Sequence, residues 1–270
     1  MKRVGYLLAM YAVVGLGIFS SCSSESDSVI ESGEGGITLA LTAETGFQST
    51  KAVNEEDYTK VDGYTVQIYK DGVSSPIVSC LYKNLTSESI YNADKSQYLL
   101  EVGKYTLKAF KGDENNNEID ASDKYMYVYG ENSFTIEKSV IPVEVTCKPT
   151  CGRVTVVFDP SMDVYFSNYA INFSTKALAS NSKVMIRNKQ QSDPCYLKVE
   201  ENEQITAEYK LTKTNGQNAD FSKKYTLSPN KALQINVKAV VKQGNVGITI
   251  DIDDRTNDIP IDIEIPSWWK

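Results

Sequence analysis

The stretch 205–211 reads Ile-Thr-Ala-Glu-Tyr-Lys-Leu, and every second residue in it is apolar. This alternation is typical of a β-strand with one face in a core and the other in water, because successive side chains of a strand point to opposite faces. The same period of two returns in 37–41, 64–68, 105–109, 143–147, 169–173, 233–239 and 246–252. No segment keeps a helical period over three turns. The sequence therefore predicts an all-β protein with antiparallel strands.

The two halves of the chain repeat the same order of segments. In the first half, 63–68, 102–109, 134–137 and 142–145 follow one another, and the similar segments of the second half are 168–173, 203–209, 225–228 and 234–237. Pro149 and Gly152 interrupt the strands between the halves. We therefore predict two tandem β-sandwiches, residues 37–148 and 149–270, each of ordinary domain size.

The N-terminus has the pattern of a secretory signal. Lys2 and Arg3 precede the uncharged run 4–19, and Ser20, Ser21 and Cys22 follow it. The pattern resembles a lipobox, in which signal peptidase II cuts before a cysteine that is diacylated on its thiol. We predict that residues 1–21 are a lipoprotein signal peptide and that Cys22 carries the lipid. The alternative is an uncleaved anchor helix with an incidental cysteine, although the run is short of the roughly 20 apolar residues of a membrane span.

Residues 22–36 are rich in serine, glutamate and glycine and have little to bury, so we predict that they form a flexible tether. Its acidic start, Glu25 and Asp27, resembles the surface-export signal of Bacteroidetes lipoproteins. These features predict a protein anchored in the outer membrane by its lipid and facing the cell exterior.

Composition disfavours several classes of function. The net charge is −7, and loss of Lys2 and Arg3 with the signal peptide changes it to −9, so no basic surface is available for nucleic acid. The sequence contains no histidine, which removes imidazole acid–base chemistry, histidine-dependent nucleophiles and imidazole metal ligands. Catalysis by carboxylates alone stays open. We predict a protein without a cofactor that is not an enzyme.

Four cysteines remain besides Cys22, namely Cys80, Cys147, Cys151 and Cys195. An even set in an exported protein is compatible with disulfides. However, Cys147 and Cys195 each fall on the apolar face of a predicted strand, where a free cysteine serves as a small core residue. Both states stay open, and the spacing of the cysteines predicts no zinc site.

Residues 113–118 read Asp-Glu-Asn-Asn-Asn-Glu and resemble the first half of a calcium loop. An EF-hand loop requires glycine at its sixth position and glutamate at its twelfth, and here those positions hold Glu118 and Lys124. We therefore predict a solvated loop and no metal site.

Tyrosines and tryptophans are the candidate contact residues. Tyr125, Tyr127 and Tyr129 alternate with Met126 and Val128, and their rings either pack inside the sandwich, the ordinary expectation, or contact a sugar or a partner protein.

Near the C-terminus, four isoleucines alternate through 259–265, and Trp268 and Trp269 follow. This segment is predicted to be the last edge strand of the second sandwich. The alternative is a strand offered to another subunit by β-augmentation, with the two tryptophans as an exposed anchor.

The order of these segments resembles a Bacteroidetes family of cell-adhesion or fimbrillin-like lipoproteins. The resemblance is carried by the lipobox, the acidic tether, the first strand at 36–41, the Tyr-x-Val-x-Ile strand at 64–68, the segment 102–109, and the junction 143–148 running into 153–158. It implies two transthyretin-like Greek-key sandwiches on the cell surface.

Polymerising members of that family are cut by an arginine-specific protease and donate a strand to a neighbour. Here Lys51 is the only basic residue between the first strand and Tyr58, which favours an accessory or stand-alone role. The sequence thus predicts a non-catalytic surface lipoprotein with a cell-adhesion or fimbria-accessory role, with fimbrial subunits, a host protein or a glycan as partner. The alternative is a glycan-binding lipoprotein of a polysaccharide uptake system.

Overall fold

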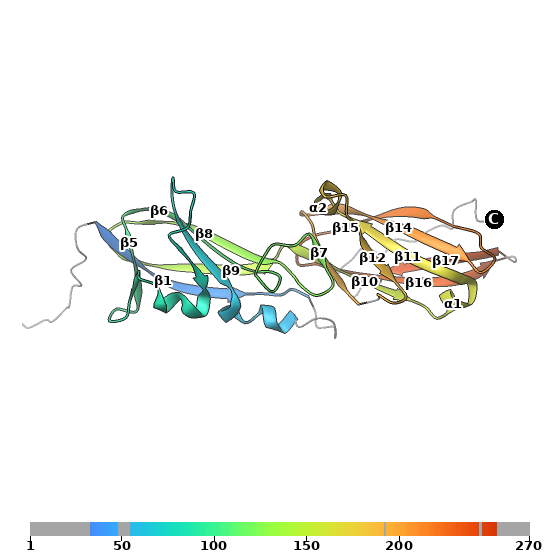
Figure 1. Cartoon of the computed structure of the whole chain (residues 1–270), viewed down its shortest axis with the longest axis horizontal. Coiled ribbons are helices and arrows are strands. Elements are labelled where there is room, and N and C mark those ends of the chain that lie inside the picture. The colour runs from blue at the N-terminus through green and yellow to red at the C-terminus, as the bar shows by residue number, and fades with distance from the viewer. Residues whose placement is uncertain (1–32, 48–54, 192, 243–244, 253–270) are drawn as a thin grey trace, which may run out of the picture.

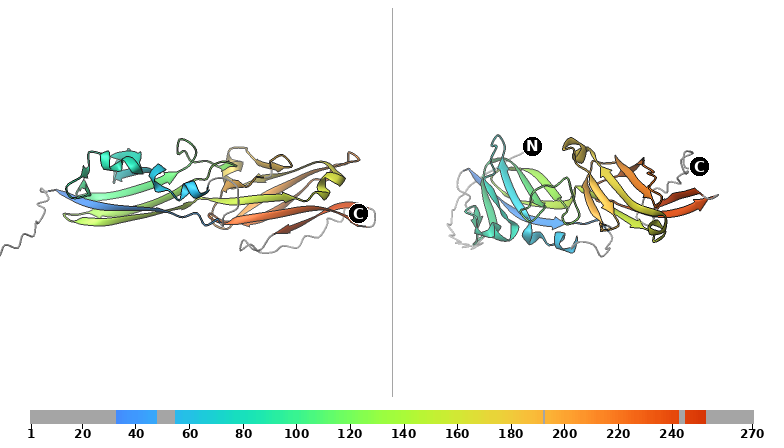
Figure 2. Two further views of the ribbon diagram at one scale, coloured as in Figure 1. Left: turned by 90° about the horizontal axis from the view of Figure 1, so that it is seen from below. Right: turned by 45° about the vertical axis from the view of Figure 1, so that its right-hand side comes forward.

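The computed structural model describes residues 33–47, 55–191, 193–242 and 245–252. Most of their regular structure is β-strand, and each helix in these ranges has at most six residues, so the all-β prediction is confirmed. Two halves lie end to end along the long axis, and each has a cluster of buried apolar side chains (Figures 1 and 2). No helix in the described ranges is long and apolar enough to cross a membrane.

The N-terminal half extends to Pro149 and contains nine strands in its described residues. They are β1 (Glu34–Ala43), β2 (Thr65–Lys70), β3 (Val78–Leu81), β4 (Tyr91–Asn92), β5 (Gln97–Glu101), β6 (Gly103–Lys111), β7 (Ala121–Ser122), β8 (Val128–Ile136) and β9 (Val140–Pro149). Three short 3-10 helices, η1 (Glu55–Tyr58), η2 (Val61–Gly63) and η3 (Tyr82–Ser87), connect them.

The C-terminal half begins at Cys151. Its strands are β10 (Cys151–Phe158), β11 (Phe166–Ser174), β12 (Met185–Asn188), β13 (Cys195–Lys198), β14 (Glu203–Lys213), β15 (Phe221–Leu227), β16 (Ala232–Lys242) and β17 (Asn245–Ile252). Two five-residue helices, α1 (Ser161–Tyr165) and α2 (Lys176–Ser180), lie on either side of β11 in the sequence.

In the N-terminal half, strands β3-β2-β6-β8 are neighbours in that order, as are β9-β1-β5-β4. The two groups join where Val128 and Tyr129 of β8 pair with Pro149 and Lys148 of β9. The first strand, β1, lies inside its sheet, parallel to β9 on one side and antiparallel to β5 on the other.

The C-terminal half repeats this pairing. Its sheets have the orders β12-β11-β14-β15 and β17-β16-β10-β13-β7, and β10 is parallel to β16 and antiparallel to β13. The repeated sequence segments fall on corresponding strands, for example 102–109 on β6 and 203–209 on β14. The domain boundaries that the repeat suggests stay a prediction.

Strand β14 shows how alternation builds the core. Ile205, Ala207 and Tyr209 have exposed fractions of 0%, whereas Gln204 and Lys210 face water. Full burial of a large apolar side chain contributes about 1.5–3 kcal/mol, so each inward-facing residue of such a strand adds to the stability of the core. The buried hydroxyls of Tyr209 and Tyr225 share a hydrogen bond of 2.5 Å, which satisfies both.

The first strand begins earlier than expected. Residues 34–36, predicted to belong to the tether, are part of β1, where Glu34 pairs with Glu101 and Gly36 with Leu99. A side chain at Gly35 would lie 2.6 Å from the carbonyl oxygen of Glu137, so glycine permits this close approach. Gly35, one of the residues that suggested a tether, is therefore required by the packing of the strand.

A segment of the N-terminal half extends the sheet of the other half. Strand β7 pairs with β13 through Ala121–Leu197 and Ser122–Tyr196, and the Lys198 amide donates to the Asp120 carbonyl oxygen at 2.8 Å. The loop before it, predicted to be a solvated hairpin loop, thus leads into a strand that links the two halves.

A buried ion pair lies at the same junction. Arg153 Nη1 is 3.0 Å from Glu55 Oε1, and the Tyr196 hydroxyl donates to the same oxygen at 2.6 Å. Arg153 also covers the Phe47 ring, 5.2 Å from its centroid, and the Gly46 amide donates to Asn230 Oδ1. Polar groups from both halves therefore meet at the junction, where Glu55 and Arg153 are buried and the Gly46–Asn230 bond is exposed.

Cys80, Cys147, Cys151 and Cys195 are all free thiols. The last three are buried, and burial raises the pKa of Cys147 and of Cys151 to about 12. At neutral pH these thiols are protonated, so they serve as small core residues rather than as nucleophiles.

Candidate functional site

The candidate site lies on the outer face of the sheet β3-β2-β6-β8. Met126 and Val128 are the core residues of the 125–129 segment, each with 0% exposure, and Tyr127 and Tyr129 point the other way. The expectation that these tyrosine rings pack inside the sandwich is therefore wrong. Large apolar side chains occupy both faces of this alternating segment, so the pattern alone could not decide which face points into the core.

Three aromatic rings gather on this face, which we call the aromatic face and define by Phe110, Tyr127 and Tyr129. The Tyr127 and Tyr129 ring centroids are 6.3 Å apart with planes 22° apart, and Phe110 lies 6.1 Å from Tyr127. Strand register produces the cluster, because Phe110 of β6 lies opposite Tyr129 of β8. All three side chains are partly exposed.

Polar side chains border the aromatic rings. Lys108 lies next to Gln67 and Glu131 in register, and its ammonium is 5.1 Å from the centroid of the Tyr69 ring. The Tyr69 hydroxyl donates to Gln67 Oε1 at 2.9 Å, and the Tyr129 hydroxyl donates to Glu131. The face thus combines flat apolar surface with hydrogen-bonding groups of both kinds.

The tyrosines of this face are neutral at physiological pH. Burial raises the pKa of Tyr127 to about 12, and burial together with the Glu131 carboxylate raises the pKa of Tyr129. Phenol groups in this state donate and accept hydrogen bonds but are poor nucleophiles. The chemistry available on the aromatic face is therefore recognition.

Tyr125 lies apart from the other two tyrosines, at the rim of a cavity of about 660 Å³. The cavity lies between η1, the end of β6, the loop 112–117 and residues 123–125. The other candidate contacts, Trp268 and Trp269, and the lipidation candidate Cys22 lie outside the described residues.

Asp113 belongs to the loop that borders this cavity, and its carboxylate binds the loop itself. Asp113 Oδ1 accepts from the amides of Asn115 at 2.9 Å and Asn117 at 2.8 Å, and these bonds lower its pKa. Within the described ranges, histidine, cysteine, aspartate and glutamate side chains form no cluster of three that could hold a metal ion.

Sequence comparison assigns a family to the chain. The family model described as a domain of unknown function, DUF4493, matches residues 33–267. The chain belongs to the DUF4493 family. A search of curated proteins found no match to this DUF4493 chain.

Solved structures of bacterial surface proteins are similar to this DUF4493 chain. The fimbrial anchor protein Mfa2 from Porphyromonas gingivalis has 12% sequence identity and a TM-score of 0.44, covering 86% of this chain and 100% of its own. A fimbrial assembly protein from Parabacteroides distasonis has 12% identity and a TM-score of 0.42, covering 84% and 100%. These are the kinds of protein that the sequence resemblance predicted. One fold hosts many functions, so the likeness assigns no partner to the DUF4493 chain.

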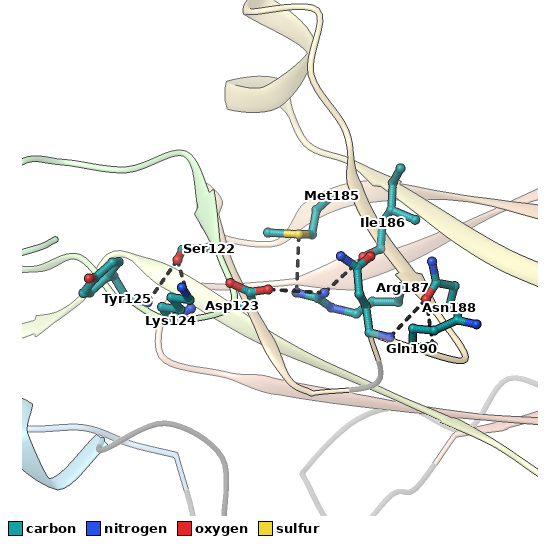
Figure 3. A network of polar contacts seen from close by, with 10 residues as sticks. Ser122, Asp123, Lys124, Tyr125, Met185, Ile186, Arg187, Asn188 and Gln190 are labelled. Atoms are coloured by element: carbon teal, nitrogen blue, oxygen red, sulfur yellow. Dashed lines mark hydrogen bonds and ion pairs between the residues drawn. The ribbon is translucent and has the colours of Figure 1, made fainter.

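Sequence reasoning missed a second buried arginine of the DUF4493 chain, in addition to Arg153. Arg187 of β12 is 1% exposed; it donates to the Ile186 carbonyl oxygen at 3.0 Å, and its Nη1 lies 4.0 Å from Asp123 Oδ2 (Figure 3). Met185 and Ile186 give the segment an apolar signal, and nothing local indicates that the arginine that follows them points inward. The partner carboxylate comes from the other half of the chain, so only the tertiary structure reveals the pair.

Proposed function

We propose that this chain is a non-catalytic, lipid-anchored protein of the cell surface that serves adhesion, either alone or as an accessory of a fimbria. The observation that carries the proposal is the aromatic face of Phe110, Tyr127 and Tyr129. A sheet surface that exposes clustered large rings bordered by polar groups is characteristic of an interaction site.

Three properties support a binding role. The rings are held by a rigid sheet, so little side-chain entropy is lost when a partner binds. Tyrosine combines apolar area with a polar tip, which suits contacts that stay partly wet. The sequence lacks histidine, and the aromatic face offers neutral phenols, so its groups are suited to contact rather than to acid–base chemistry.

The adhesion proposal is tested with a strain that expresses the full chain. The double variant Tyr127→Ala/Tyr129→Ala is expected to reduce attachment of the bacteria to host cells or to partner bacteria, at unchanged surface amount. Tyr91→Ala, which removes a partly buried tyrosine from the other sheet, is the matched control. Equal attachment by the double variant and the parent would refute a role for the aromatic face.

The lipid anchor rests on the N-terminal pattern around Cys22. Cys22→Ala is expected to abolish labelling with a palmitate analogue and to leave the precursor uncleaved by signal peptidase II. Two or three acyl chains give durable anchoring where a single chain gives only reversible binding. Label retained on the Cys22→Ala protein would contradict the assignment.

A second candidate function is glycan binding in a polysaccharide uptake system. The specific observation in its favour is the near-parallel arrangement of the Tyr127 and Tyr129 rings, 6.3 Å apart, because sugar rings pack their C–H faces on such surfaces. A glycan array separates the candidates: reproducible sugar binding that Tyr127→Ala abolishes favours this function, and its absence favours a protein partner.

A further inference from the structure

We propose that Asn215 is a site of spontaneous deamidation, at which the chain converts its own amide side chain into a carboxylate. The site is independent of the aromatic face, because it lies in the loop that joins β14 to β15 in the C-terminal half. Asn215 and Gly216 are the only Asn–Gly pair in the sequence, and both residues are exposed. Glycine favours the reaction because it has no Cβ to obstruct its own backbone nitrogen.

The loop holds the two residues in a tight turn. The Gly216 amide donates to the Lys213 carbonyl oxygen at 2.8 Å, and the Lys213 amide donates to the Gln217 carbonyl oxygen at 2.8 Å. Gly216 has a φ of 84°, a left-handed conformation that glycine adopts without strain. A side chain added at Gly216 would meet no atom within 4 Å, so the turn is open on that side.

The side chain of Asn215 is turned towards the backbone that follows it. The Gln217 amide donates to Asn215 Oδ1 at 3.0 Å. The ring of atoms that this bond closes contains both Cγ of Asn215 and the nitrogen of Gly216, so these two atoms are kept close together. The same bond places a donor on the oxygen that becomes negatively charged when Cγ is attacked, as in an oxyanion hole.

The reaction needs water and hydroxide and no other reactant. Hydroxide removes the Gly216 amide proton, and the nitrogen attacks Cγ of Asn215. A bond forms between these two atoms, the bond from Cγ to Nδ2 breaks, and ammonia leaves with a proton from water, which regenerates the hydroxide. Water then opens the resulting succinimide at either of its carbonyl carbons, and the product is aspartate or isoaspartate.

One hydrogen bond opposes the reaction. The Gly216 amide proton is held by the Lys213 carbonyl oxygen, which also accepts from Ser167 Oγ at 3.3 Å. The turn must open before hydroxide reaches this proton, so we expect the reaction to be slower in the folded chain than in a free peptide. Exposed loop bonds open at a small fraction of the free energy of global unfolding, so the conversion does not require the domain to unfold.

Isoaspartate at position 215 changes the end of the hairpin. It carries the main chain through Cβ and Cγ of the former side chain, which adds a methylene group between Thr214 and Gly216. The Thr214 amide donates to the Tyr165 carbonyl oxygen at the end of α1 at 3.1 Å, so the hairpin is fixed at this point. We therefore expect the longer main chain to loosen the contact between the hairpin and α1.

The test incubates the mature chain without its lipid at neutral and at mildly alkaline pH, and peptide mapping by mass spectrometry follows deamidation. Asn215 is expected to deamidate at least about tenfold faster than Asn218, which lies in the same loop but precedes alanine. Both aspartate and isoaspartate are expected at position 215, at a rate that rises with the hydroxide concentration. Circular dichroism confirms that the chain stays folded.

Two variants separate the groups involved. Gly216→Ala is expected to slow the reaction at least about tenfold, because a methyl group obstructs the attacking nitrogen. Gln217→Pro removes the amide that bonds to Asn215 Oδ1 and keeps the carbonyl that pairs with Lys213, and it is expected to slow the reaction about threefold or more. Lys224→Met, outside the loop, is the control and is expected to react at the rate of the parent.

The outcomes decide each part of the proposal. Deamidation of Asn215 no faster than that of Asn218 overturns the site. Aspartate without isoaspartate, or an unchanged rate in Gly216→Ala, shows direct hydrolysis by water and overturns the attack by Gly216. An unchanged rate in Gln217→Pro overturns the role of the Gln217 amide.

Discussion

At the scale of single residues, the junction contains an ion pair that is almost completely buried. Glu55 and Arg153 are 8% and 4% exposed, and the hydroxyl of Tyr196 is bonded to the same carboxylate oxygen. Removal of one partner from a buried pair leaves the other charge without compensation, and this commonly costs about 3–5 kcal/mol. The junction is therefore sensitive to a single substitution.

Glu55→Ala is expected to lower the free energy of unfolding by about 3–5 kcal/mol because it strips the buried carboxylate from Arg153. Urea denaturation followed by tyrosine fluorescence measures the change. Lys60→Ala removes an exposed ion pair with Asp57 and is expected to leave stability nearly unchanged. If Glu55→Ala changes the free energy of unfolding as little as Lys60→Ala does, the buried pair adds no stability.

Lys223 is a residue whose replacement is expected to raise stability, whereas replacement of Glu55 is expected to lower it. Its Nζ is buried with no hydrogen-bond partner in the described residues, 5.4 Å from the Tyr225 ring centroid, and burial lowers its pKa. Lys223→Met is expected to stabilise the protein at pH 7 by up to about 1 kcal/mol, because an unsatisfied polar group is replaced by an apolar one. The exposed neighbour gives the control Lys224→Met, expected to be neutral.

The pH dependence of this gain follows from the lowered pKa. The folded protein holds the Lys223 proton more weakly than the unfolded chain. The cost in folding free energy of keeping this buried ammonium charged is therefore fully present below the lowered pKa. This cost decreases as the pH rises from the lowered pKa towards 10.5, the ordinary pKa of lysine. The difference in Tm between Lys223→Met and the parent should therefore shrink as the pH approaches that value, and a constant difference would contradict this account.

At the scale of strands, the alternation of apolar and polar residues predicted most of the long β-strands and the face of each that points into the core. Ile205, Ala207 and Tyr209 of β14 are buried as expected, because polar residues between them leave only one face for the core. The same signal failed at 125–129, where both faces are apolar, and at β7, whose two residues carry no period at all. The pairing of β7 with β13 depends on contacts between distant segments, which no local pattern encodes.

The C-terminal isoleucines give a prediction at this scale. Residues 259–265 lie outside the described residues, and β17 pairs with β16 through one of its edges. Deletion of residues 259–270 is expected to lower Tm strongly, because burial of four isoleucines contributes about 6–12 kcal/mol before entropy costs. Calorimetry and size-exclusion chromatography measure stability and assembly together.

Deletion of residues 267–270 alone is the control for that experiment, since it keeps the isoleucines. If the longer deletion leaves Tm unchanged and removes only higher-order assembly, the segment serves a neighbouring subunit. That result would support strand donation and reverse our preference.

At the scale of the whole molecule, the two halves share more than a linker. Asp120 bonds to the Lys198 amide and to Asn181, and Lys198 pairs with Glu118 at 2.8 Å. Together with β7 and the buried Glu55–Arg153 pair, these contacts join both hydrophobic clusters. We expect the mature chain to unfold in one cooperative calorimetric transition.

Ser122→Pro is expected to split that transition in two, because proline cannot donate to the β7–β13 ladder. Limited proteolysis should then cut within 112–125 faster than in the parent. Ser122→Ala keeps the backbone amide and is the matched control. A single transition in Ser122→Pro would mean that the remaining junction contacts suffice.

The parallel pairing of β1 with β9 also dictates an order of events during synthesis. Thr42 of β1 pairs with Thr146 of β9, 104 residues later in the sequence. During synthesis β1 therefore has no hydrogen-bonding partner on that side until β9 has been made. Loop closure of this span is slow compared with a hairpin, and an incomplete chain exposes apolar strand surface meanwhile. A ribosome that stalls before residue 140 therefore releases a polypeptide with no route to the native N-terminal half, and such fragments are natural substrates for chaperones and proteases.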